Sequence, residues 1–264
     1  MFEFKTLSRE GTIDILRRLS IGEAKFNELN KVVTNTRTLT RRLKELQREG
    51  LIHKVKLRYR ITSKGLGIVF KIAEFEGRKK QKWVQDEEFA NIGHRWMKIS
   101  LRSLVDLFIE EFGDELISIV LYGSAIKRAF QLGKSDIDML YILEDSATDI
   151  WQREENIFKR FQATWEYRAC NYMLKTQGFY GYPEVTTTSL HRSYAKTFQL
   201  AYLDMLLSRA VLYDKDEFFQ KLMKRLRKEL KILGTTRVEY ADGTYCWLLK
   251  PDVRPGELIE INLR

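Results

Sequence analysis

The sequence Val120-Leu121-Tyr122-Gly123-Ser124 ends one apolar run, and after eleven intervening residues Asp136-Ile137-Asp138-Met139-Leu140-Tyr141 begins another. Each apolar run has the composition of a buried strand, and the Gly-Ser pair indicates a turn at the end of the first. Successive side chains of a strand point to opposite faces, so Asp136 and Asp138 are expected to project from the same face. The sequence therefore predicts two neighbouring carboxylates beside a Gly-Ser turn.

Two crowded carboxylates repel each other, and a divalent cation relieves that repulsion. Mg²⁺ takes oxygen ligands and is commonly held by one or two carboxylates together with substrate phosphates. Gly123 lets backbone N–H groups approach a phosphate closely, and Ser124 adds a hydroxyl donor. A helix over 125–130 would favour the same anion at its N-terminus. The pattern predicts a site for a metal ion and a polyphosphate.

This arrangement resembles the nucleotidyltransferase superfamily of DNA polymerase beta. The signature of that superfamily is an apolar strand, Gly-Ser, a spacer, and Asp-x-Asp between apolar residues. The match covers residues 117–143, and its Ser-Asp-Ile-Asp at 135–138 is typical of small prokaryotic members. One departure stands in the segment 125–130, which lacks the second glycine that relatives often carry.

The resemblance implies a mixed β-sheet with flanking helices, Mg²⁺ (or Mn²⁺) as cofactor, a nucleoside triphosphate as substrate and a hydroxyl group as acceptor. It implies catalytic and metal-binding roles for Asp136, Asp138 and a third carboxylate. Glu184 is the candidate for the third carboxylate, and Glu166 is the alternative. The residues implied in nucleotide binding are Gly123, Ser124, Lys127, Arg128 and Ser135.

The composition indicates a globular chain of about two domains, with 264 residues, 44% of them hydrophobic, and three prolines. Two cysteines and three histidines are scattered without the spacing of a disulfide framework or a metal cluster. No apolar stretch approaches the roughly 20 residues that a transmembrane helix needs, and the N-terminus lacks a signal-peptide pattern. We therefore expect a cytoplasmic protein that does not engage a membrane.

The positive charge is concentrated in the first third of the chain. Residues 1–80 contain 20 Lys and Arg against 9 Asp and Glu, whereas the remaining residues contain 26 against 27. The whole net charge of +10 therefore originates in residues 1–80. Such asymmetry is typical of a nucleic-acid-binding module joined to a neutral one.

The first eighty residues have the pattern of three helices followed by a hairpin. Apolar residues at helical spacing predict helices over 12–19 and 25–29, and a basic third helix begins after a cap at Asn35 or Thr36. Gly50 is expected to end the third helix. Two short strands at 51–57 and 58–62 follow, and then a helix from Ser63.

This order resembles the winged helix-turn-helix of small prokaryotic transcription regulators such as the MarR and HxlR families. The resemblance implies that the third helix enters the major groove of double-stranded DNA and that the hairpin is the wing. Readers of this kind usually bind as dimers, so a homodimer is an open alternative, as is a winged helix that mediates only protein contacts. The residues placed to contact DNA are Arg37, Thr38, Arg41, Arg42, Lys54, Lys56, Arg58 and Arg60.

The rest of the chain is expected to begin after a charged break at 77–82. The predicted elements are helices at 84–112 and 149–162, strands at 167–175 and 184–190, helices at 193–213 and 216–233, and a hairpin over 238–249 that turns at Asp242-Gly243.

We therefore expect an α+β protein of three parts: a winged helix-turn-helix (1–80), a nucleotidyltransferase domain with its leading helix (81–190), and a helical extension with a terminal hairpin (191–264). The expected activity is transfer of a nucleoside monophosphate from a nucleoside triphosphate to a hydroxyl acceptor. One alternative is a transcription regulator whose second part only senses nucleotide. Another is an antitoxin-like protein adenylyltransferase, with a partner protein as acceptor.

Overall fold

The computed structural model describes residues 4–76, 81–126, 130–254 and 256–263. These residues form two compact units, each assembled from separate stretches of the chain. The first unit comprises residues 1–79, 94–107 and 154–182, and the second comprises 80–93, 108–153 and 183–264. The division into three consecutive domains remains a prediction.

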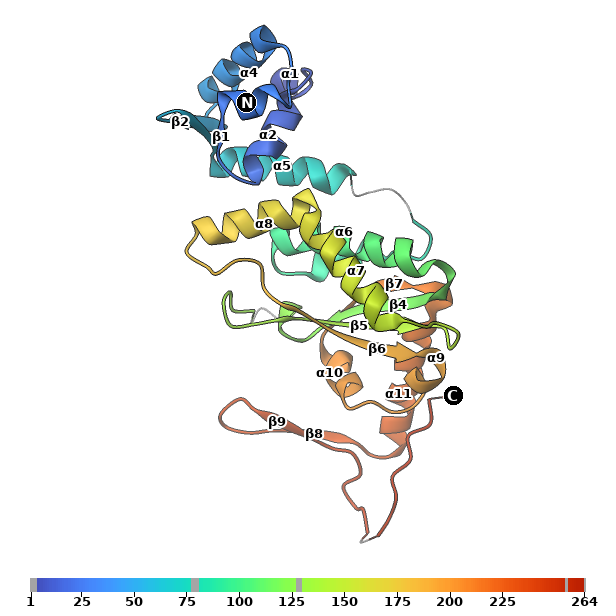
Figure 1. Cartoon of the computed structure of the whole chain (residues 1–264). Helices are drawn as coiled ribbons and strands as arrows, with labels where there is room; N and C mark the ends of the chain where they lie inside the picture. The colour runs from blue at the N-terminus through green and yellow to red at the C-terminus, as the bar shows by residue number, and fades with distance from the viewer. Residues whose placement is uncertain (1–3, 77–80, 127–129, 255, 264) are drawn as a thin grey trace. The chain divides into compact units, whose positions relative to one another are not determined.

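The first unit contains the three helices and the hairpin expected from the sequence (Figure 1). Its three-stranded sheet has the order β1-β3-β2, with both pairs antiparallel. The elements from its N-terminal stretch are α1 (Phe4–Leu7), α2 (Thr12–Ser20), β1 (Ala24–Lys25), α3 (Phe26–Asn30), α4 (Thr36–Arg48), β2 (Ile52–Val55), β3 (Arg58–Ile61) and α5 (Ser63–Glu76).

Local sequence fixes both ends of α4. Asn35 is its N-cap, because the Asn35 side chain accepts a hydrogen bond from the backbone N–H of Thr38 at 3.0 Å. Gly50, with φ of 69°, follows the helix as expected. Three leucines at helical spacing, Leu39, Leu43 and Leu46, are buried in the core of this unit. The inward face of α4 is thus confirmed.

The expected strand over 167–175 is wrong, because this segment belongs to the helix α8 (Trp165–Thr176). Thr164 caps α8 by accepting a hydrogen bond from the backbone N–H of Tyr167. The buried residues Ala169, Cys170 and Leu174 follow the spacing of one helical face, not the alternation of a strand. Within the first unit, the Arg17 guanidinium lies 5.3 Å from the ring centre of Trp165 at the start of α8.

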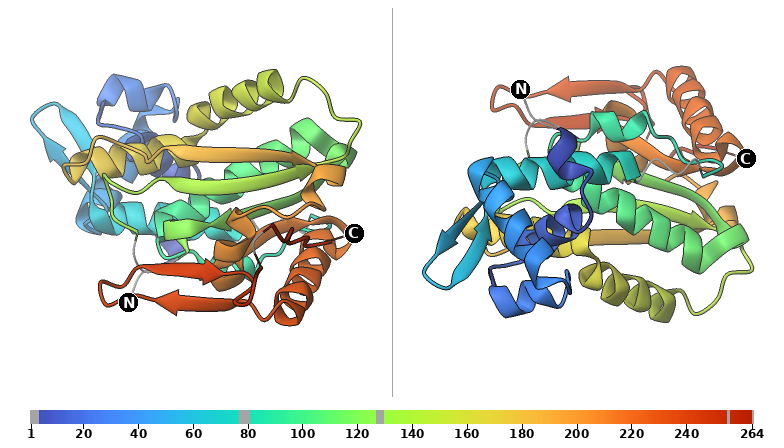
Figure 2. Two further views of the ribbon diagram at one scale, coloured as in Figure 1. Left: turned by 90° about the horizontal axis from the view of Figure 1, so that it is seen from below. Right: turned by 90° about the horizontal axis from the view of Figure 1, so that it is seen from above.

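The second unit is built on a four-stranded mixed sheet of order β6-β5-β4-β7, shown edge-on in Figure 1 and face-on in Figure 2. The central strands β4 and β5 are antiparallel, β7 pairs antiparallel with β4, and β6 pairs parallel with β5. The strands are β4 (Leu116–Tyr122), β5 (Ile137–Leu143), β6 (Val185–His191) and β7 (Arg209–Asp214). A mixed sheet was expected, and both strands of the opening motif are confirmed.

The helical elements of this part of the chain are mostly short. They are η1 (Glu88–Asn91), α6 (Arg95–Phe112), η2 (Gly113–Glu115), η3 (Gly123–Ala125), α7 (Ile150–Ala163), α9 (Arg192–Ala195), α10 (Ala201–Leu207), η4 (Lys215–Glu217) and α11 (Phe218–Ile232), of which α6 and α7 are shared between the two units. The expected helix over 84–112 is therefore confined to 95–112 in its α-helical part. Val84 instead forms an isolated bridge with Tyr213 of β7.

The expected single helix over 193–213 is also wrong, because it is divided into α9 and α10 and its last five residues belong to β7. Their apolar side chains are buried against β4, so tertiary pairing prevails over a local pattern that also suits a helix. Asp214, at the end of β7, is buried and accepts hydrogen bonds from the Ser118 hydroxyl at 2.7 Å and the Phe219 N–H at 2.9 Å. This carboxylate joins β4, β7 and the start of α11.

Aromatic and aliphatic side chains cover the two faces of the sheet differently. On one face, Phe108 and Phe112 of α6 lie 4.9 and 5.9 Å from the ring of Tyr141. On the other, Val120 and Leu140 belong to a buried cluster with residues of α10 and α11. Asp138 is two residues before Leu140 on β5, so its side chain projects toward the α10–α11 face.

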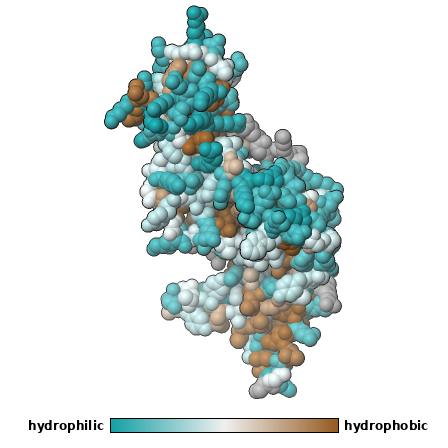
Figure 3. All heavy atoms as spheres, in the orientation of Figure 1, coloured by the Kyte–Doolittle hydropathy of each residue, from teal (hydrophilic) through white to brown (hydrophobic). Residues whose placement is uncertain are grey.

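The C-terminal part contains the expected hairpin, formed by β8 (Thr236–Glu239) and β9 (Tyr245–Leu248). Its turn is the predicted Asp242-Gly243, in which the Asp242 carboxylate accepts a hydrogen bond from the Thr244 N–H at 2.9 Å. Hydrophobic side chains gather around the C-terminal segment (Figure 3), where Val253 and Leu258 are exposed. No helix in the described parts of the chain is both long and apolar enough to cross a membrane.

Candidate functional sites

The outward face of α4 carries a row of cations. Arg37, Thr40, Arg41, Lys44 and Arg48 are exposed and recur at the spacing of one helical face. They line a shallow surface groove of about 520 Å³. The predicted DNA contacts Arg37 and Arg41 thus share one face, and the groove adds Lys44 and Arg48, which the sequence interpretation missed.

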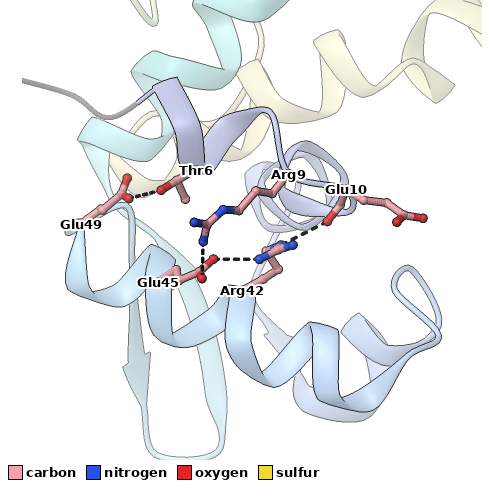
Figure 4. Close-up of polar contacts among 6 residues, drawn as sticks. All are labelled: Thr6, Arg9, Glu10, Arg42, Glu45 and Glu49. Atoms are coloured by element: carbon pink, nitrogen blue, oxygen red, sulfur yellow. Dashed lines mark hydrogen bonds and ion pairs between the residues drawn. The ribbon is translucent and has the colours of Figure 1, made fainter.

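Arg42 lies on the opposite side of α4, and its predicted contact with DNA is corrected. Its side chain is only 6% exposed. The Arg42 guanidinium donates from Nε to the carbonyl of Glu10 at 3.2 Å and from Nη1 to Glu45 at 3.0 Å (Figure 4). Since these bonds hold Arg42 inside the unit, it anchors α4 rather than contacting a ligand.

The polar cluster around Arg42 fixes α4 against the segment between α1 and α2 (Figure 4). Arg9 forms an ion pair with Glu45, and the Thr6 hydroxyl donates to Glu49. Burial acts to raise the pKa of Glu45, but the hydrogen bonds from Arg9 and Arg42 outweigh it and the pKa is lowered. Glu45 therefore stays ionised and holds two arginines.

The basic residues of the wing differ in their exposure and in whether they form ion pairs. Lys54, Lys56 and Arg58 are exposed on the β2–β3 hairpin. Arg60 instead forms an ion pair with Glu23, and this hydrogen bond raises the pKa of Arg60. Thr38 is half-buried at the start of α4. Of the four cations predicted to contact DNA from the hairpin, Lys54, Lys56 and Arg58 therefore remain exposed for that contact.

In the second unit, the Gly-Ser turn and the two aspartates meet as predicted. Gly123 has φ of 71°, and a Cβ atom at this position would lie 2.4 Å from Oδ2 of Asp138. Only glycine permits this approach and this conformation together. The backbone of the turn therefore lies directly against the carboxylate of the second strand.

The electrostatics of the pair are those of crowded acids. Asp138 is half-buried on β5, while Asp136 is exposed immediately before the strand. Burial raises the pKa of Asp138, and the neighbouring charge of Asp136 raises it further. A divalent cation would relieve both effects, so the pair fits Mg²⁺ or Mn²⁺ in its donor chemistry.

The other predicted nucleotide contacts are less closely gathered. The Ser124 hydroxyl donates to the carbonyl of Asp136 at 3.4 Å, which ties the turn to the start of β5. The Ser135 hydroxyl accepts from the N–H of Gln131 at 3.0 Å within its own loop. Lys127 and Arg128 lie outside the described residues. Of the helix expected over 125–130, Ala125 is the last residue of η3, and residues 127–129 lie outside the described residues.

The third carboxylate is not identified by the geometry. Glu184 is exposed just before β6, and its carbonyl accepts from the N–H of Ile137 at 2.9 Å. Glu166 lies in the first turn of α8, in the first unit. Within the described residues, no group of three Asp, Glu, His or Cys side chains is arranged to hold a metal ion.

Two residues that the sequence interpretation missed lie near the pair. Tyr122 faces Asp138 across the β4–β5 ladder. Burial raises the pKa of Tyr122 despite a hydrogen bond with Thr188, and the charges of Asp138 and Asp204 raise it further. Asp204, on α10, accepts a hydrogen bond from the Tyr245 hydroxyl at 2.5 Å. No spacing in the sequence pointed to Asp204, because it is distant from the motif along the chain.

The first unit is a winged helix-turn-helix, defined by the helices α2, α3 and α4 and the hairpin β2–β3. The HxlR-like helix-turn-helix family matches residues 7–88. An uncharacterized HTH-type transcriptional regulator from Methanocaldococcus jannaschii is 33% identical over 87 residues, which are 30% of this chain and 82% of that protein. The chain belongs to the HxlR-like helix-turn-helix family. The predicted resemblance to HxlR proteins is thereby confirmed for the N-terminal third.

Proposed function

We propose that this protein is a DNA-binding transcription regulator that contacts double-stranded DNA with α4 and the β2–β3 hairpin. The observation that carries the proposal is the exposed row of Arg37, Arg41, Lys44 and Arg48 on one face of α4. A helix with such a face fits the major groove, and its cations can contact phosphates and base edges. The relative from Methanocaldococcus jannaschii, named as a transcriptional regulator, supports the same function.

The test is selection of double-stranded DNA from a random library by the full chain, followed by binding measurements on the selected duplex. We expect Lys44→Gln and Arg48→Gln each to weaken binding by about fivefold or more, because each removes one charged contact. Lys71→Gln, an exposed lysine on α5 away from the groove, is the matched control and should bind like the wild type. Equal affinity of all three variants would refute the assignment of α4.

The acidic site of the second unit favours an additional function, the binding of a nucleoside triphosphate with Mg²⁺ (or Mn²⁺). The support is the close approach of Gly123 to Asp138, which places the Gly-Ser turn beside a carboxylate pair. When bound, the metal would neutralise charge on the phosphates. The roles proposed for this chain are metal binding by Asp136 and Asp138 and phosphate binding by Gly123 and Ser124.

Turnover would consist of nucleotidyl transfer. A hydroxyl oxygen of the acceptor forms a bond to the α-phosphorus, the α–β phosphoanhydride bond breaks, and pyrophosphate leaves with its electron pair. The hydroxyl proton passes to a carboxylate of the site, for which Glu184 remains the candidate. The HxlR-like helix-turn-helix match and the relative named as a transcriptional regulator favour nucleotide sensing without transfer as the form of this function.

Calorimetry with ATP and Mg²⁺, together with incubation of labelled ATP and cell extract as a source of acceptors, separates the two forms. Binding without incorporation supports the sensor, and label on a protein or nucleic acid supports the transferase. Asp138→Asn should abolish metal-dependent binding in either case, with Glu87→Gln, an exposed acid in the same unit, as control. Unchanged ATP binding in Asp138→Asn would remove the acidic site from both forms.

A further inference from the structure

A second candidate site lies beside β7 in the same unit. It is a pocket of about 810 Å³, lined by residues of η1, α10, β7 and α11 and by Ile126 of the segment after the Gly-Ser turn. Pockets of this size accommodate small molecules. Among its polar lining residues are three cations, Arg209, Lys224 and Arg227, and one acid, Glu88.

The three cations of this pocket have few hydrogen-bond or ion-pair partners among the described residues. Arg209 donates from Nη1 to the carbonyl of Met205 at 2.8 Å, but its buried Nε has no hydrogen-bond partner among the described residues. Lys224 and Arg227 are exposed on α11, three residues apart, and in the part of the chain that the structure describes neither forms a hydrogen bond or ion pair. This Nε is too buried for a ligand to reach, so the groups that the pocket offers to an anion are those of Lys224 and Arg227, with the charge of Arg209 beside them.

The charges of the pocket also work against one another. Burial lowers the pKa of Arg209, the neighbouring charge of Arg227 lowers it further, and Glu88 only partly opposes this. A bound anion would satisfy the donors and reduce the repulsion between the two arginines. Three cations against one acid favour an anion with more than one negative charge, and the planar guanidinium group of Arg227 favours the paired oxygens of a phosphate.

We propose that this pocket binds a phosphate-bearing small molecule of the condensed-phosphate class, held by Arg209, Lys224 and Arg227. This binding needs no metal and does not rest on the proposed chemistry of Asp136 and Asp138. The pocket is nevertheless near them. Arg209 faces Tyr122 across the β4–β7 ladder and Tyr122 faces Asp138 across the β4–β5 ladder. All three side chains thus project from one face of the sheet, and two strand spacings of roughly 5 Å separate the outer two.

The test is calorimetric titration of the full chain with pyrophosphate at low salt, with EDTA present so that no divalent metal contributes. We expect Arg227→Gln and Lys224→Gln each to weaken pyrophosphate binding by about tenfold, since a hydrogen bond to a charged group is lost. Lys228→Gln removes the same charge from an exposed position of α11 that does not line the pocket, and should change affinity less than about twofold.

Arg209→Lys completes the set, because it keeps the charge at the β7 position. We expect it to weaken binding less than Arg227→Gln does, while the melting temperature stays near that of the wild type. Absence of pyrophosphate binding by the wild type at millimolar concentration would overturn the proposal. Equal weakening by Lys228→Gln would overturn it as well, because it would indicate attraction to the overall charge of α11 only.

Two further arms identify the source of the phosphate and separate this proposal from the acidic site. If ATP binds in EDTA and Arg227→Gln weakens it, the pocket holds the phosphate tail of a nucleotide; if only pyrophosphate binds, it holds a free condensed phosphate. Asp138→Asn should not weaken pyrophosphate binding in EDTA, because it removes a negative charge from the same face of the sheet. Loss of pyrophosphate binding in Asp138→Asn would place the anion on the acidic site and overturn a separate pocket.

Discussion

At the scale of single residues, the acidic site depends on glycine at position 123, which has no Cβ atom. The lack of a Cβ at Gly123 lets the turn lie against the carboxylate of Asp138, and the left-handed φ of Gly123 makes the same demand independently. The sequence interpretation predicted both residues from the motif. It did not predict the contact between them, which depends on the pairing of Tyr122 with Asp138.

We predict that Gly123→Ala abolishes metal-dependent ATP binding and lowers stability. The new methyl group must displace the Asp138 carboxylate, and a left-handed alanine costs about 1–2 kcal/mol. Gly93→Ala is the control, because a Cβ there meets no atom within 4 Å. Calorimetry and thermal unfolding measure the two effects. Normal ATP binding in Gly123→Ala would show that the turn does not contact the nucleotide.

The raised pKa of Asp138 gives a second residue-scale prediction. Burial and then Asp136 make ionisation harder in the folded chain than in the unfolded chain, whose Asp has its ordinary pKa of 3.8. The protonated form therefore favours the fold below 3.8, and this stability is lost as the pH rises through the raised pKa. At pH 7 in EDTA, Asp138→Asn should therefore melt at a higher temperature than the wild type.

The size of this difference should shrink as the pH is lowered toward 3.8, while Mg²⁺ should stabilise only the wild type. Glu184→Gln, at an exposed acid, should melt like the wild type in EDTA. Thermal unfolding across the pH range measures all of these differences. A lower melting temperature of Asp138→Asn at pH 7 would contradict the assigned cause of the pKa shift.

At the scale of elements, α4 combines two faces with different tasks. Arg41 faces solvent along the basic groove, whereas the adjacent Arg42 is buried among Glu10, Glu45 and Arg9. We predict opposite outcomes for the two substitutions. Arg41→Gln should weaken DNA binding by about fivefold or more at unchanged stability. Arg42→Gln should lower the free energy of unfolding by about 2 kcal/mol, because it breaks a buried charged hydrogen-bond network.

Urea unfolding and DNA titration of both variants, made in parallel, check this prediction. Since each change removes one positive charge from neighbouring positions of α4, the pair is its own control for net charge. If Arg42→Gln were fully stable and Arg41→Gln unfolded more readily, the assignment of the two faces would be reversed.

The same scale explains what could be predicted from the sequence. Elements with a clear hydrophobic periodicity and local end signals were predicted well. In α4 the predicted cap and the predicted buried leucines are both observed, and the strands β4 and β5 are observed where they were expected. Segments over 167–175 and 209–214 were misassigned, because alternation and helical spacing coexist in short apolar runs. The partner strand β4 decides the second case, and distant pairing of this kind is not visible along the chain.

The residues of the candidate sites also divide into those that the sequence predicted and those that it did not. The motif gave Gly123, Asp136 and Asp138 together, since their spacing reflects one hairpin of neighbouring strands. The sequence placed Lys224 and Arg227 together on one basic helix, but it did not indicate that they share a pocket with Arg209, because only the packing of α11 beside β7 brings the three together. Arg42 was misplaced because the periodicity of α4 does not indicate which arginine at the edge of the apolar face becomes buried.

At the scale of the whole molecule, a strongly basic helix-turn-helix accompanies a second unit of nearly balanced charge. We predict that binding of ATP with Mg²⁺ and binding of DNA are coupled, as a nucleotide-sensing regulator requires. By thermodynamic linkage, the factor by which ATP changes DNA affinity must equal the factor by which DNA changes ATP affinity, typically about 5–150-fold. Titrations in both orders measure it, and a factor of one in both would exclude sensing.

The burial of Arg42 has a practical consequence for directing the helix-turn-helix to new DNA sequences. A library that randomises all basic positions of α4 would include Arg42, whose loss destabilises the helix-turn-helix, and many of its members would be lost through lower stability and not through altered DNA recognition. Diversity restricted to positions 37, 40, 41, 44 and 48, with Arg42 held constant, would sample altered specificity while retaining the scaffold that presents it.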